Sequence, residues 1–493
     1  MTPGNRLIAT GQIADFENRR LIRNRPSLQG DWTVNIGSGS PGGVPLDMYA
    51  AKYSFSPIGS PDCTNDFVVF PVNHTGSSSA ANLLGVRNLY ATTCTGTVPT
   101  VFFAYDVGTG VVQTSPILSL DGTKVAFVES VTNGSIFHVL RLGTTGSNGT
   151  SSISPAVPGT GNNALDTRVT MSGSVSVTRS SPFVDYTHDI AYVGDDIGRL
   201  HKFTGVFKGT PAEAGSPWPF TVAAGVILTG PVFDSGASQN IFVGGSNGNL
   251  YCVTSAGAAC STAFLSVASG TSPGAVIDAP IVDSTEQTVF AEASNSTNSV
   301  LMQATTALGS VVRATMGING TDLYNGAFDN AYFTSVSTGH MYFCGNLTTA
   351  ATPTLWRVTF NSSGTMSSAN DGGSFELVLG GQTGTGDDCT PLTEVFNTSL
   401  GKDFLFVGVK NHGFMTGTPN CGNQTCIMSF ALPTAFPFTF PVVANATTNA
   451  NLGSAGTSGM IIDNVSGTNG ASQIYFGNLQ VNTGVQASQS ALR

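Results

Sequence analysis

The stretch "NIFVGGSNGNLYCV", residues 240–253, places two short apolar runs on either side of a Gly/Ser/Asn core. Its residues 244–248 fit the G-x-S-x-G pattern of a serine-hydrolase nucleophile elbow. That motif needs a strand that runs into a helix, whereas Ser246 stands between two runs with the composition of β-strands. Gly and Asn are typical of a β-turn that needs positive φ. The stretch therefore predicts a β-hairpin, and Ser246 is not expected to be a nucleophile.

The same apolar run recurs along the chain and defines eight units, spaced on average 58 residues apart. One aligned column holds a large apolar residue in every unit: Val69, Phe127, Tyr192, Phe242, Phe290, Phe343, Phe406 and Tyr475. Three to four antiparallel strands per ~50–60 residues are typical of a β-propeller blade. A string of sandwiches would need about 100 residues per repeat. We predict an all-β fold, a single β-propeller of eight blades, with seven blades as the alternative.

The two ends of the chain are expected to close the ring together. The last unit ends in "TGVQASQSALR" (483–493), which leaves room for a third strand but not for a fourth. Near the start, "GDWTVNIGSG" (30–39) has no blade of its own and resembles "SPWPFTVAAG" (216–225), the fourth strand of the third unit. We therefore predict that an N-terminal strand at residues 32–36 completes the C-terminal blade. The expected organisation is an arm over residues 1–30 and a propeller over residues 31–493.

Composition and charge argue against a nucleic-acid partner and a membrane span. Charged residues make up only 10% of the chain and 60 of its 493 residues are glycine, which suits short strands and tight turns. The net charge of −10 disfavours nucleic-acid binding, which needs a basic face. No apolar run reaches the ~18 residues of a membrane span.

The N-terminal segment is rich in basic residues. Five of the nineteen Lys and Arg residues fall within the first 25 residues, and we interpret this segment as a solvated arm, with a membrane- or partner-binding arm as the alternative.

Cysteine usage indicates an oxidising compartment. The even number and close spacing favour four disulfides between sequence neighbours, with unpaired thiols as the alternative: Cys63–Cys94, Cys252–Cys260, Cys344–Cys389 and Cys421–Cys426. Eleven N-x-S/T sequons slightly exceed chance and permit glycosylation of an exported protein. The first residues lack the layout of a secretory signal, so we expect an extracytoplasmic protein whose signal segment is not part of the given chain.

The segments "AYVGDDIGRLHKF" (191–203) and "IFVGGSNGNLYCV" (241–253) resemble the quinoprotein-type (pyrroloquinoline-quinone-like) β-propeller repeat. The chain as a whole also resembles secreted, Gly/Ser/Thr-rich bacterial propeller proteins. Enzymes of the quinoprotein family are similar to one another in a docking tryptophan in nearly every blade, whereas this chain has only Trp32, Trp218 and Trp356. It also lacks their adjacent cysteine pair and a C-x-x-C-H haem motif. The resemblance therefore implies the fold but no cofactor.

Other chemistry-bearing residues are scattered. The six histidines show no metal-ligand spacing: His74, His138, His188, His201, His340 and His412. The pairs Asp195-Asp196 and Asp387-Asp388 are expected to cap turns, with Ca²⁺ binding as the alternative. The recurring Asp185, Asp234 and Asp283 are expected to accept hydrogen bonds from turn amides. Glu129 and Glu292 take the place of a repeated glycine, which brings them toward one rim of the ring.

The function expected from these observations is non-catalytic. The chain is interpreted as a secreted or cell-surface binding or structural module, with an unknown protein or carbohydrate ligand and with no catalytic, cofactor or metal residues assigned. One alternative is a secreted carbohydrate-active enzyme that uses carboxylates at the channel mouth. A second alternative is a self-assembling extracellular subunit, since abundant polar residues suit packing between copies.

Overall fold

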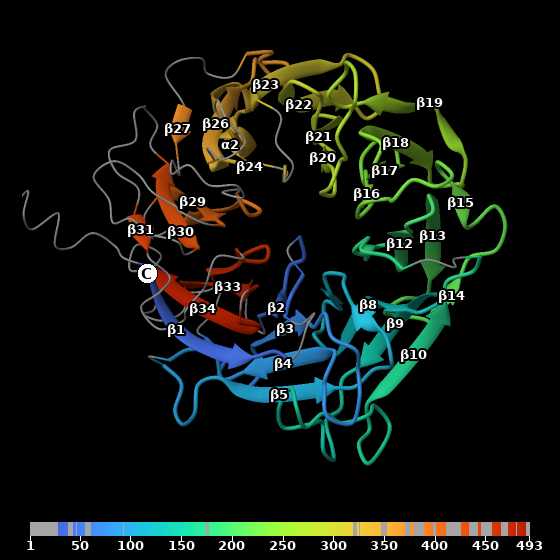
Figure 1. The fold of residues 1–493 in the computed structure, drawn as a ribbon, viewed down its shortest axis with the longest axis vertical. Helices are drawn as coiled ribbons and strands as arrows, with labels where there is room; N and C mark the ends of the chain where they lie inside the picture. The colour runs from blue at the N-terminus through green and yellow to red at the C-terminus, as the bar shows by residue number, and fades with distance from the viewer. Residues whose placement is uncertain are drawn as a thin grey trace, which may run out of the picture.

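The protein is a β-propeller in which eight antiparallel blades of four or five strands stand around a central axis, as the computed structural model shows (Figure 1). Blades 5 and 6 form one continuous sheet, because a short parallel pairing at Asn346 joins them. The structure describes residues 28–37, 43–45, 47–54, 61–91, 93–173, 177–318, 323–324, 326–346, 353–369, 376–378, 389–397, 401–410, 425–432, 442–444, 456–464, 472–479 and 481–489. The prediction of eight blades is confirmed. The predicted arm at residues 1–30 lies almost wholly outside the described residues and stays a prediction.

The first four blades follow one another in the sequence. Blade 1 consists of β2 (Ala51–Tyr53), β3 (Phe67–Pro71), β4 (Leu83–Arg87) and β5 (Thr100–Tyr105). Blade 2 consists of β6 (Val111–Val112), β7 (Ile117–Leu118), β8 (Lys124–Val131), β9 (Gly134–Arg141) and β10 (Leu165–Thr170). Blade 3 consists of β11 (Phe183–Asp185), β12 (Ile190–Gly194), β13 (Arg199–Thr204), β14 (Ala212–Glu213) and β15 (Phe220–Thr221). Blade 4 consists of β16 (Val232–Phe233), β17 (Asn240–Gly244), β18 (Asn249–Thr254) and β19 (Ala259–Ser266).

The second half completes the ring. Blade 5 consists of β20 (Ile281–Asp283), β21 (Thr288–Ser294), β22 (Asn298–Thr305) and β23 (Val312–Ile318). Blade 6 consists of β24 (Ala327–Phe328), the short helices α2 (Asn330–Thr334) and η1 (Val336–Thr338), β25 (His340–Asn346), β26 (Pro353–Thr359) and β27 (Glu376–Val378). Blade 7 consists of β28 (Thr393–Asn397), β29 (Lys402–Val409), β30 (Cys426–Leu432) and β31 (Val442–Ala444). Blade 8 consists of β32 (Ile461–Asn464), β33 (Ser472–Asn478), β34 (Thr483–Gln489) and, from the other end of the chain, β1 (Leu28–Asn35).

The hairpin predicted at residues 240–253 is present. β17 and β18 pair antiparallel with Gly244 opposite Leu250, and Gly248 in the turn between them has a φ of +78°. Along β17, Ile241 packs toward blade 3 while Phe242 packs toward blade 5. Both faces of the strand are therefore buried, which explains why its apolar residues run continuously instead of alternating.

The ring closes as predicted. β1 pairs antiparallel with β34, and Trp32 lies opposite Gln486. In Figure 1 the blue β1 runs beside the red β34, so the outer strand of the last blade comes from the start of the chain. Apolar clusters then continue around the ring from one blade to the next; one of them joins Trp32 and Tyr475 of blade 8 to the sheet of blade 1. Closure of this kind hides most strand edges.

A hydrogen bond that recurs in blades 2, 3 and 4 fixes the linker before the inner strand and shows the true register of the repeat. Ser180 Oγ accepts from the Gly194 amide at 2.7 Å, and Thr229 Oγ1 accepts from the Gly244 amide at 2.9 Å. In blade 2, Thr114 Oγ1 accepts from the amide of Val128 at 3.0 Å. Val128, and not Glu129, is thus the counterpart of the repeated glycine. The alignment through Phe127 was one residue out of register, because Ala126 and not Phe127 pairs with the residue after the proline, as Tyr192 does in blade 3.

No helix in the described part of the chain has both the length and the apolar composition that crossing a membrane requires.

Candidate functional site

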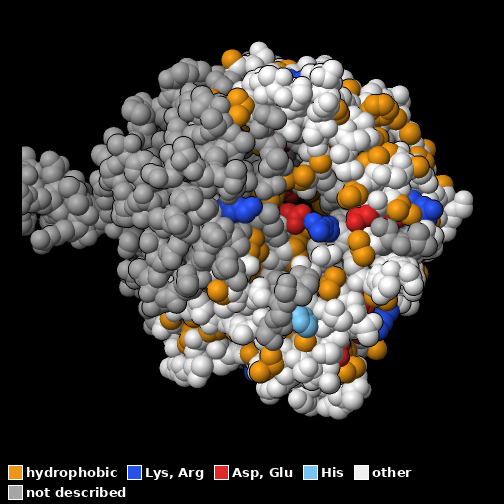
Figure 2. All heavy atoms as spheres, viewed as in Figure 1, with side chains coloured by type: hydrophobic (Ala, Val, Ile, Leu, Met, Phe, Trp, Pro, Cys, Tyr) orange, Lys and Arg blue, Asp and Glu red, His pale blue; other side chains and the backbone are white. Residues whose placement is uncertain are grey.

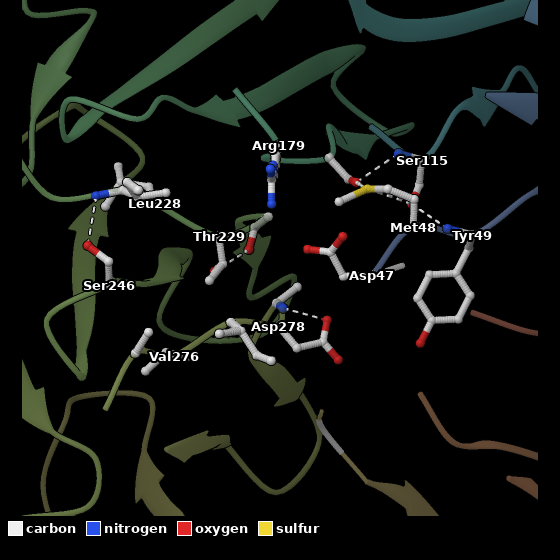
Figure 3. Close-up of a pocket in the computed structure, with 16 residues that line it drawn as sticks. Asp47, Met48, Tyr49, Ser115, Arg179, Leu228, Thr229, Ser246, Val276 and Asp278 are labelled. Atoms are coloured by element: carbon white, nitrogen blue, oxygen red, sulfur yellow. Dashed lines mark hydrogen bonds between the residues drawn. The ribbon is translucent and has the colours of Figure 1, made fainter. Parts of the chain in front are cut away.

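The linkers that lead into the inner strands meet at one end of the central channel. They enclose a cavity of about 270 Å³, which we call the channel mouth. Its lining is mostly apolar or small, with three charged side chains: Asp47, Arg179 and Asp278. Figure 2 shows acidic and basic side chains side by side at the central opening. Figure 3 shows Asp47, Arg179 and Asp278 around the same space, with the Tyr49 ring at its edge.

Serine side chains connect successive linkers around this mouth. The Tyr49 amide donates to Ser115 Oγ at 2.9 Å, and the Ser115 amide donates to Ser181 Oγ at 2.9 Å. Ser180 Oγ in turn donates to the Thr229 carbonyl at 2.8 Å. The linkers of blades 1 to 4 are therefore held to one another as well as to their own sheets. Such support from neighbouring hydrogen bonds keeps the lining side chains in place, as a preformed site requires.

The titratable groups at the mouth affect one another's pKa. Burial raises the pKa of Tyr49 well above its ordinary value, and the nearby carboxylates of Asp278 and Asp47 raise it further. Beside Arg179, burial raises the pKa of Asp196 to about 6, with the Arg179 charge opposing this shift. Arg179 thus lies close enough to Asp196 to affect its pKa, and shares the lining of the mouth with Asp47 and Asp278.

Blade 5 departs from the repeat beside this cavity. At the places where blade 4 has Thr229 and Gly244, blade 5 has Asp278 and Glu292. The Glu292 side chain is only 4% exposed, its Oε1 has no hydrogen-bond partner among the described residues, and its carboxylate accepts from the Gly326 amide. Burial, and then the Asp278 carboxylate, raise the pKa of Glu292 well above its usual range. A buried carboxyl in place of a repeated glycine is costly for stability, and such departures are typical of functional positions.

The contact made at the Glu292 position differs from the contacts made at the repeated glycines. At equivalent interfaces a side chain of the following linker fills the space over the repeated glycine: Leu228 lies over Gly194, and Val276 lies over Gly244. Over Glu292 the following linker instead presents Gly326. Gly326 stands at the place of the inner-strand proline, so it is not the counterpart of Leu228 or Val276, and its contact with Glu292 is a hydrogen bond from its amide.

The other charged residues predicted from sequence have structural partners. Glu129 is buried, accepts from the Gly110 amide at 2.6 Å, and lies 3.2 Å from Nε2 of His138, whose Nδ1 lies 3.0 Å from Asp166. Blade 3 repeats this arrangement: His201 lies 3.3 Å from Asp195 and 2.6 Å from Glu213.

Glu129 and Glu292 therefore do not converge. Glu129 lies in blade 2 against the linker that follows blade 1, whereas Glu292 lies in blade 5 against blade 6. The two positions are not equivalent in the repeat either, because Glu129 corresponds to Asp195. A carboxylate pair made of these two residues cannot act on one bond.

The predicted turn caps are confirmed. Asp185 accepts from the amides of Thr187 and His188, and Asp234 accepts from those of Gly236 and Ser238. Asp283 accepts in the same way from Thr285 and Glu286. Asp195 accepts from the amides of Ile197 and Arg199. This carboxylate, for which Ca²⁺ binding was the alternative, therefore has a turn-capping role. In the described ranges no three His, Cys, Asp or Glu side chains could hold a metal ion together; Asp387, Asp388 and His412 lie outside those ranges.

Three cysteine pairs lie at disulfide distance in the structure: Cys63–Cys94, Cys252–Cys260 and Cys344–Cys389. The fourth expected pair, Cys421–Cys426, cannot be placed, because Cys421 and the side chain of Cys426 fall outside the described residues. Ser246 lies in the turn after β17, where its Oγ accepts from the Ile227 amide at 3.1 Å, so this hydroxyl has a structural partner.

Sequence interpretation did not single out Asp47, Arg179 or Asp278. Their signal is positional, since Arg179 and Asp278 lie two or three residues before the proline that opens an inner strand, as in "RSSP" (179–182) and "DAP" (278–280). A hydroxyl residue two places before that proline recurs in blades 2, 3 and 4, and Asp278 replaces it in blade 5. Comparing the units at this position, instead of at the glycine, would have singled out Asp278 but not Asp47 or Arg179.

The sequence matches no family model and no curated protein. Among solved structures, the chain is similar to Sqt1 of Chaetomium thermophilum, with 11% identity and a TM-score of 0.51 over 92% of this chain and 98% of that one. It is also similar to the Dos1 propeller, with 10% identity and a TM-score of 0.50 over 94% of this chain and 95% of that one. At this level of identity the likeness shows a β-propeller and nothing about activity.

Proposed function

We propose that the protein is a non-catalytic, extracytoplasmic binding module that holds a positively charged group of its ligand in the channel mouth. The observation that carries this proposal is the departure of blade 5 from the repeat. Asp278 and Glu292 stand where blade 4 has Thr229 and Gly244, at the blade whose linker lines the cavity. A scaffold position that places a buried carboxyl beside a solvent-reachable cavity indicates selection for binding over stability.

The chemistry of the mouth favours a cation with an apolar stem. Met48, Leu228 and Val276 give the cavity apolar walls, and Asp47 and Asp278 outnumber the one basic side chain, Arg179. Mostly apolar walls with a few convergent polar groups are the usual composition of ligand pockets. A primary ammonium group on an alkyl chain meets both requirements.

Three cysteine pairs at disulfide distance support the extracytoplasmic part of the proposal, because disulfides persist in oxidising compartments. We also propose that the blades are related to the quinoprotein-type repeat. This relationship assigns no cofactor-binding residues to the chain.

Isothermal titration with hexylammonium, hexanol and hexanoate tests the site. We expect hexylammonium to bind and the neutral and anionic analogues to bind at least tenfold more weakly. D278T restores the hydroxyl that blade 4 carries and should reduce hexylammonium binding at least tenfold. The matched control D185N removes a carboxylate from a turn away from the mouth and should leave binding unchanged. Equal binding of the three probes, or unchanged binding by D278T, would contradict the proposal.

A second candidate function is acid-assisted cleavage of polysaccharide, which one carboxyl pair favours. Glu394 lines a larger cavity of about 820 Å³ along the inner strands β2, β7, β28 and β32. Burial, together with a hydrogen bond to Asp403, raises the pKa of Glu394 to about 9, so this carboxyl keeps its proton at neutral pH. However, hydrogen-bonded carboxyls lie closer together than the ~5 Å or more that separates a glycosidase pair. Sharing of one proton is therefore the better account.

Hydrolysis assays distinguish the two functions. If the protein cleaves β-glucan or chitin oligosaccharides, E394Q should abolish cleavage, because an amide cannot donate the required proton. A binding module shows no cleavage with either form of the protein.

A further inference from the structure

A groove between blades 1 and 2 lies apart from the channel mouth and shares no residue with it. It encloses about 690 Å³ and has an aromatic floor formed by Tyr53, Phe67 and Phe102. The Tyr53 and Phe67 rings stack with centroids 5.3 Å apart, and Phe102 lies 5.3 Å beyond Phe67. A cavity of this size is within the range of ~300–1,000 Å³ that is typical of ligand sites.

The walls of the groove are polar. Thr64 and Asn65 come from the turn between β2 and β3, and Asp121 and Thr123 come from the turn between β7 and β8; all four are exposed. The segment 142–150 adds hydroxyl, amide and backbone groups along the same side. An apolar floor between walls of hydroxyl and amide groups suits a ligand whose faces are apolar and whose edges carry many hydroxyls.

Cross-links hold these walls in place. The Cys63–Cys94 pair ties the first turn to the loop after β4. Asp62 accepts from the amides of Thr64 and Asn65 and from the Asn65 side chain, at 2.8–2.9 Å. On the other wall Asp121 Oδ1 accepts from the amide and the hydroxyl of Thr123. A site that is already ordered loses little entropy when a ligand binds.

Among the described residues that line the groove, Arg87 is the one with a basic side chain. Its guanidinium lies over the Phe102 ring, 5.0 Å from the centroid, and makes no ion pair in the part of the chain that the structure describes. This cation–π contact favours the position of the guanidinium over the ring, and the N–H donors lie in the guanidinium plane. A guanidinium held in this way is suited to bind a carboxylate through two parallel hydrogen bonds.

The groove is not suited to an extended peptide. Peptides that bind to sheets usually add a strand to a free edge. Here part of the outer strand β5 is covered, because the Ala104 amide donates to the Asn148 carbonyl at 2.8 Å and the Ala156 amide donates to the Ala104 carbonyl at 2.9 Å. The segment 148–156 thus prevents a peptide from pairing along the whole of this strand.

We infer that this groove binds an oligosaccharide that carries a carboxylate, a chain containing uronic acid. The apolar faces of the sugar rings lie along Tyr53 and Phe102, the hydroxyls bind Asn65, Asp121 and Thr123, and the carboxylate binds Arg87. The inference concerns a separate site and does not depend on the proposed function of the channel mouth.

Titration calorimetry on the full chain tests this site with three probes, the trisaccharides of galacturonic, glucuronic and mannuronic acid. At least one should bind, and its methyl ester, which lacks the negative charge, should bind at least tenfold more weakly. R87Q should lose at least tenfold in affinity for the acid form and little for the ester. F102A should weaken binding of both forms, because it removes part of the floor.

Two control variants make the result specific. F264A removes an aromatic ring that is 53% exposed in blade 4, and D278T alters the channel mouth; both should bind the acidic trisaccharide like the unmodified chain. Thermal unfolding shows whether R87Q and F102A remain folded. The inference is wrong if none of the three acids binds, if R87Q binds the acid form unchanged, or if a triglutamate peptide binds more tightly than every trisaccharide.

Discussion

The indole N–H of Trp32 donates to the backbone carbonyl of Leu89 at 2.8 Å, across 57 residues of sequence. Trp32 belongs to the outer strand of blade 8, whereas Leu89 follows β4 in blade 1, so this bond joins the two ends of the ring. The centroid of the Trp32 ring lies 6.0 Å from that of Tyr475, at an interplanar angle of 49°. Trp218 meets Tyr192 in blade 3 in nearly the same way, at 5.8 Å and 49°. The likeness noted between the segments at 30–39 and 216–225 is therefore structural.

W32F should lower the free energy of unfolding by about 1–3 kcal/mol, because it leaves the buried carbonyl of Leu89 without its donor. W218F is the matched control: it removes an equivalent ring, whose N–H makes no hydrogen bond to the described residues. Urea unfolding of the two variants measures the difference. If both substitutions cost the same, the hydrogen bond contributes nothing to closure.

A buried charge cluster lies at the same boundary. Lys52 Nζ is 3.0 Å from Asp463 and 3.9 Å from Asp66, and the Tyr90 hydroxyl donates to Asp463 at 2.9 Å. K52M leaves two buried carboxylates without their cation and should cost about 3–5 kcal/mol. K202M is the control, since Lys202 contacts Trp218 and one carbonyl but makes no ion pair with the described residues, and it should cost about 1 kcal/mol or less. Chemical denaturation checks both values, and equal costs would contradict a role for the cluster in closure.

Much of this architecture could be predicted from sequence, because propeller blades repeat. The hairpin at 240–253, the eight units and the strand contributed by Trp32 each follow from a local pattern. The grouping of charges at the channel mouth does not follow from a local pattern, because the ring brings Asp47, Arg179 and Asp278 together from three linkers far apart in sequence. The register of blade 2 failed for a different reason: the alanine Ala126 holds the column position, and the neighbouring Phe127 was aligned in its place because it is aromatic.

Two buried histidines make stability depend on pH. Burial by itself would lower the pKa of His138, but its hydrogen bonds to Asp166 and Glu129 outweigh burial and raise it; Asp195 and Glu213 do the same for His201. A histidine whose pKa is higher in the folded than in the unfolded protein stabilises the folded state. This contribution is complete at a pH below the unfolded pKa of ~6.5, and it is lost as the pH rises through the folded pKa. The melting temperature should therefore fall as the pH rises above about 6.5.

H138Q and H201Q should each flatten this pH dependence, because glutamine does not titrate. H188Q is the control, since His188 is exposed and pairs only with the Asp185 of its own turn. Calorimetric melting between pH 5 and 9 provides the measurement. A slope of the melting temperature that is unchanged in the H138Q/H201Q double variant would show that these pairs are not the source.

Reduction should destabilise the protein, mainly through its longer cross-linked loops. Cys344–Cys389 spans 45 residues and Cys63–Cys94 spans 31, whereas Cys252–Cys260 spans 8. Loop-closure entropy predicts about 3–4 kcal/mol for each of the two longer loops and somewhat less for the short one. Alkylation before and after reduction counts the thiols, and melting of C63S/C94S against C252S/C260S ranks the loops. Alkylation of all eight cysteines without reduction would also refute the extracytoplasmic assignment.

In a eukaryotic secretory pathway, the sequons should be glycosylated selectively. We expect glycans on asparagines whose side-chain amide makes no hydrogen bond as a donor, because only these can be modified without loss of a contact. Asn133 and Asn361 are exposed, and neither side-chain amide nitrogen donates a hydrogen bond within the described residues. Asn148 instead donates to the Gly143 carbonyl while accepting from the Tyr105 hydroxyl. Asn295 donates to the carbonyls of both Ala268 and Ser269.

A glycan on Asn148 or Asn295 would displace these bonds from loops that cover a blade edge or close a turn, so chains that carry one should fold poorly and be depleted from the secreted protein. Glycopeptide mass spectrometry of secreted material should find Asn133 and Asn361 occupied and the other two bare. N133Q should shift the protein on a gel by one glycan, while N148Q should change its melting temperature and not its glycan mass. High occupancy at Asn148 in well-folded protein would mean that its contacts with Gly143 and Tyr105 are not needed to seat the loop on blade 1.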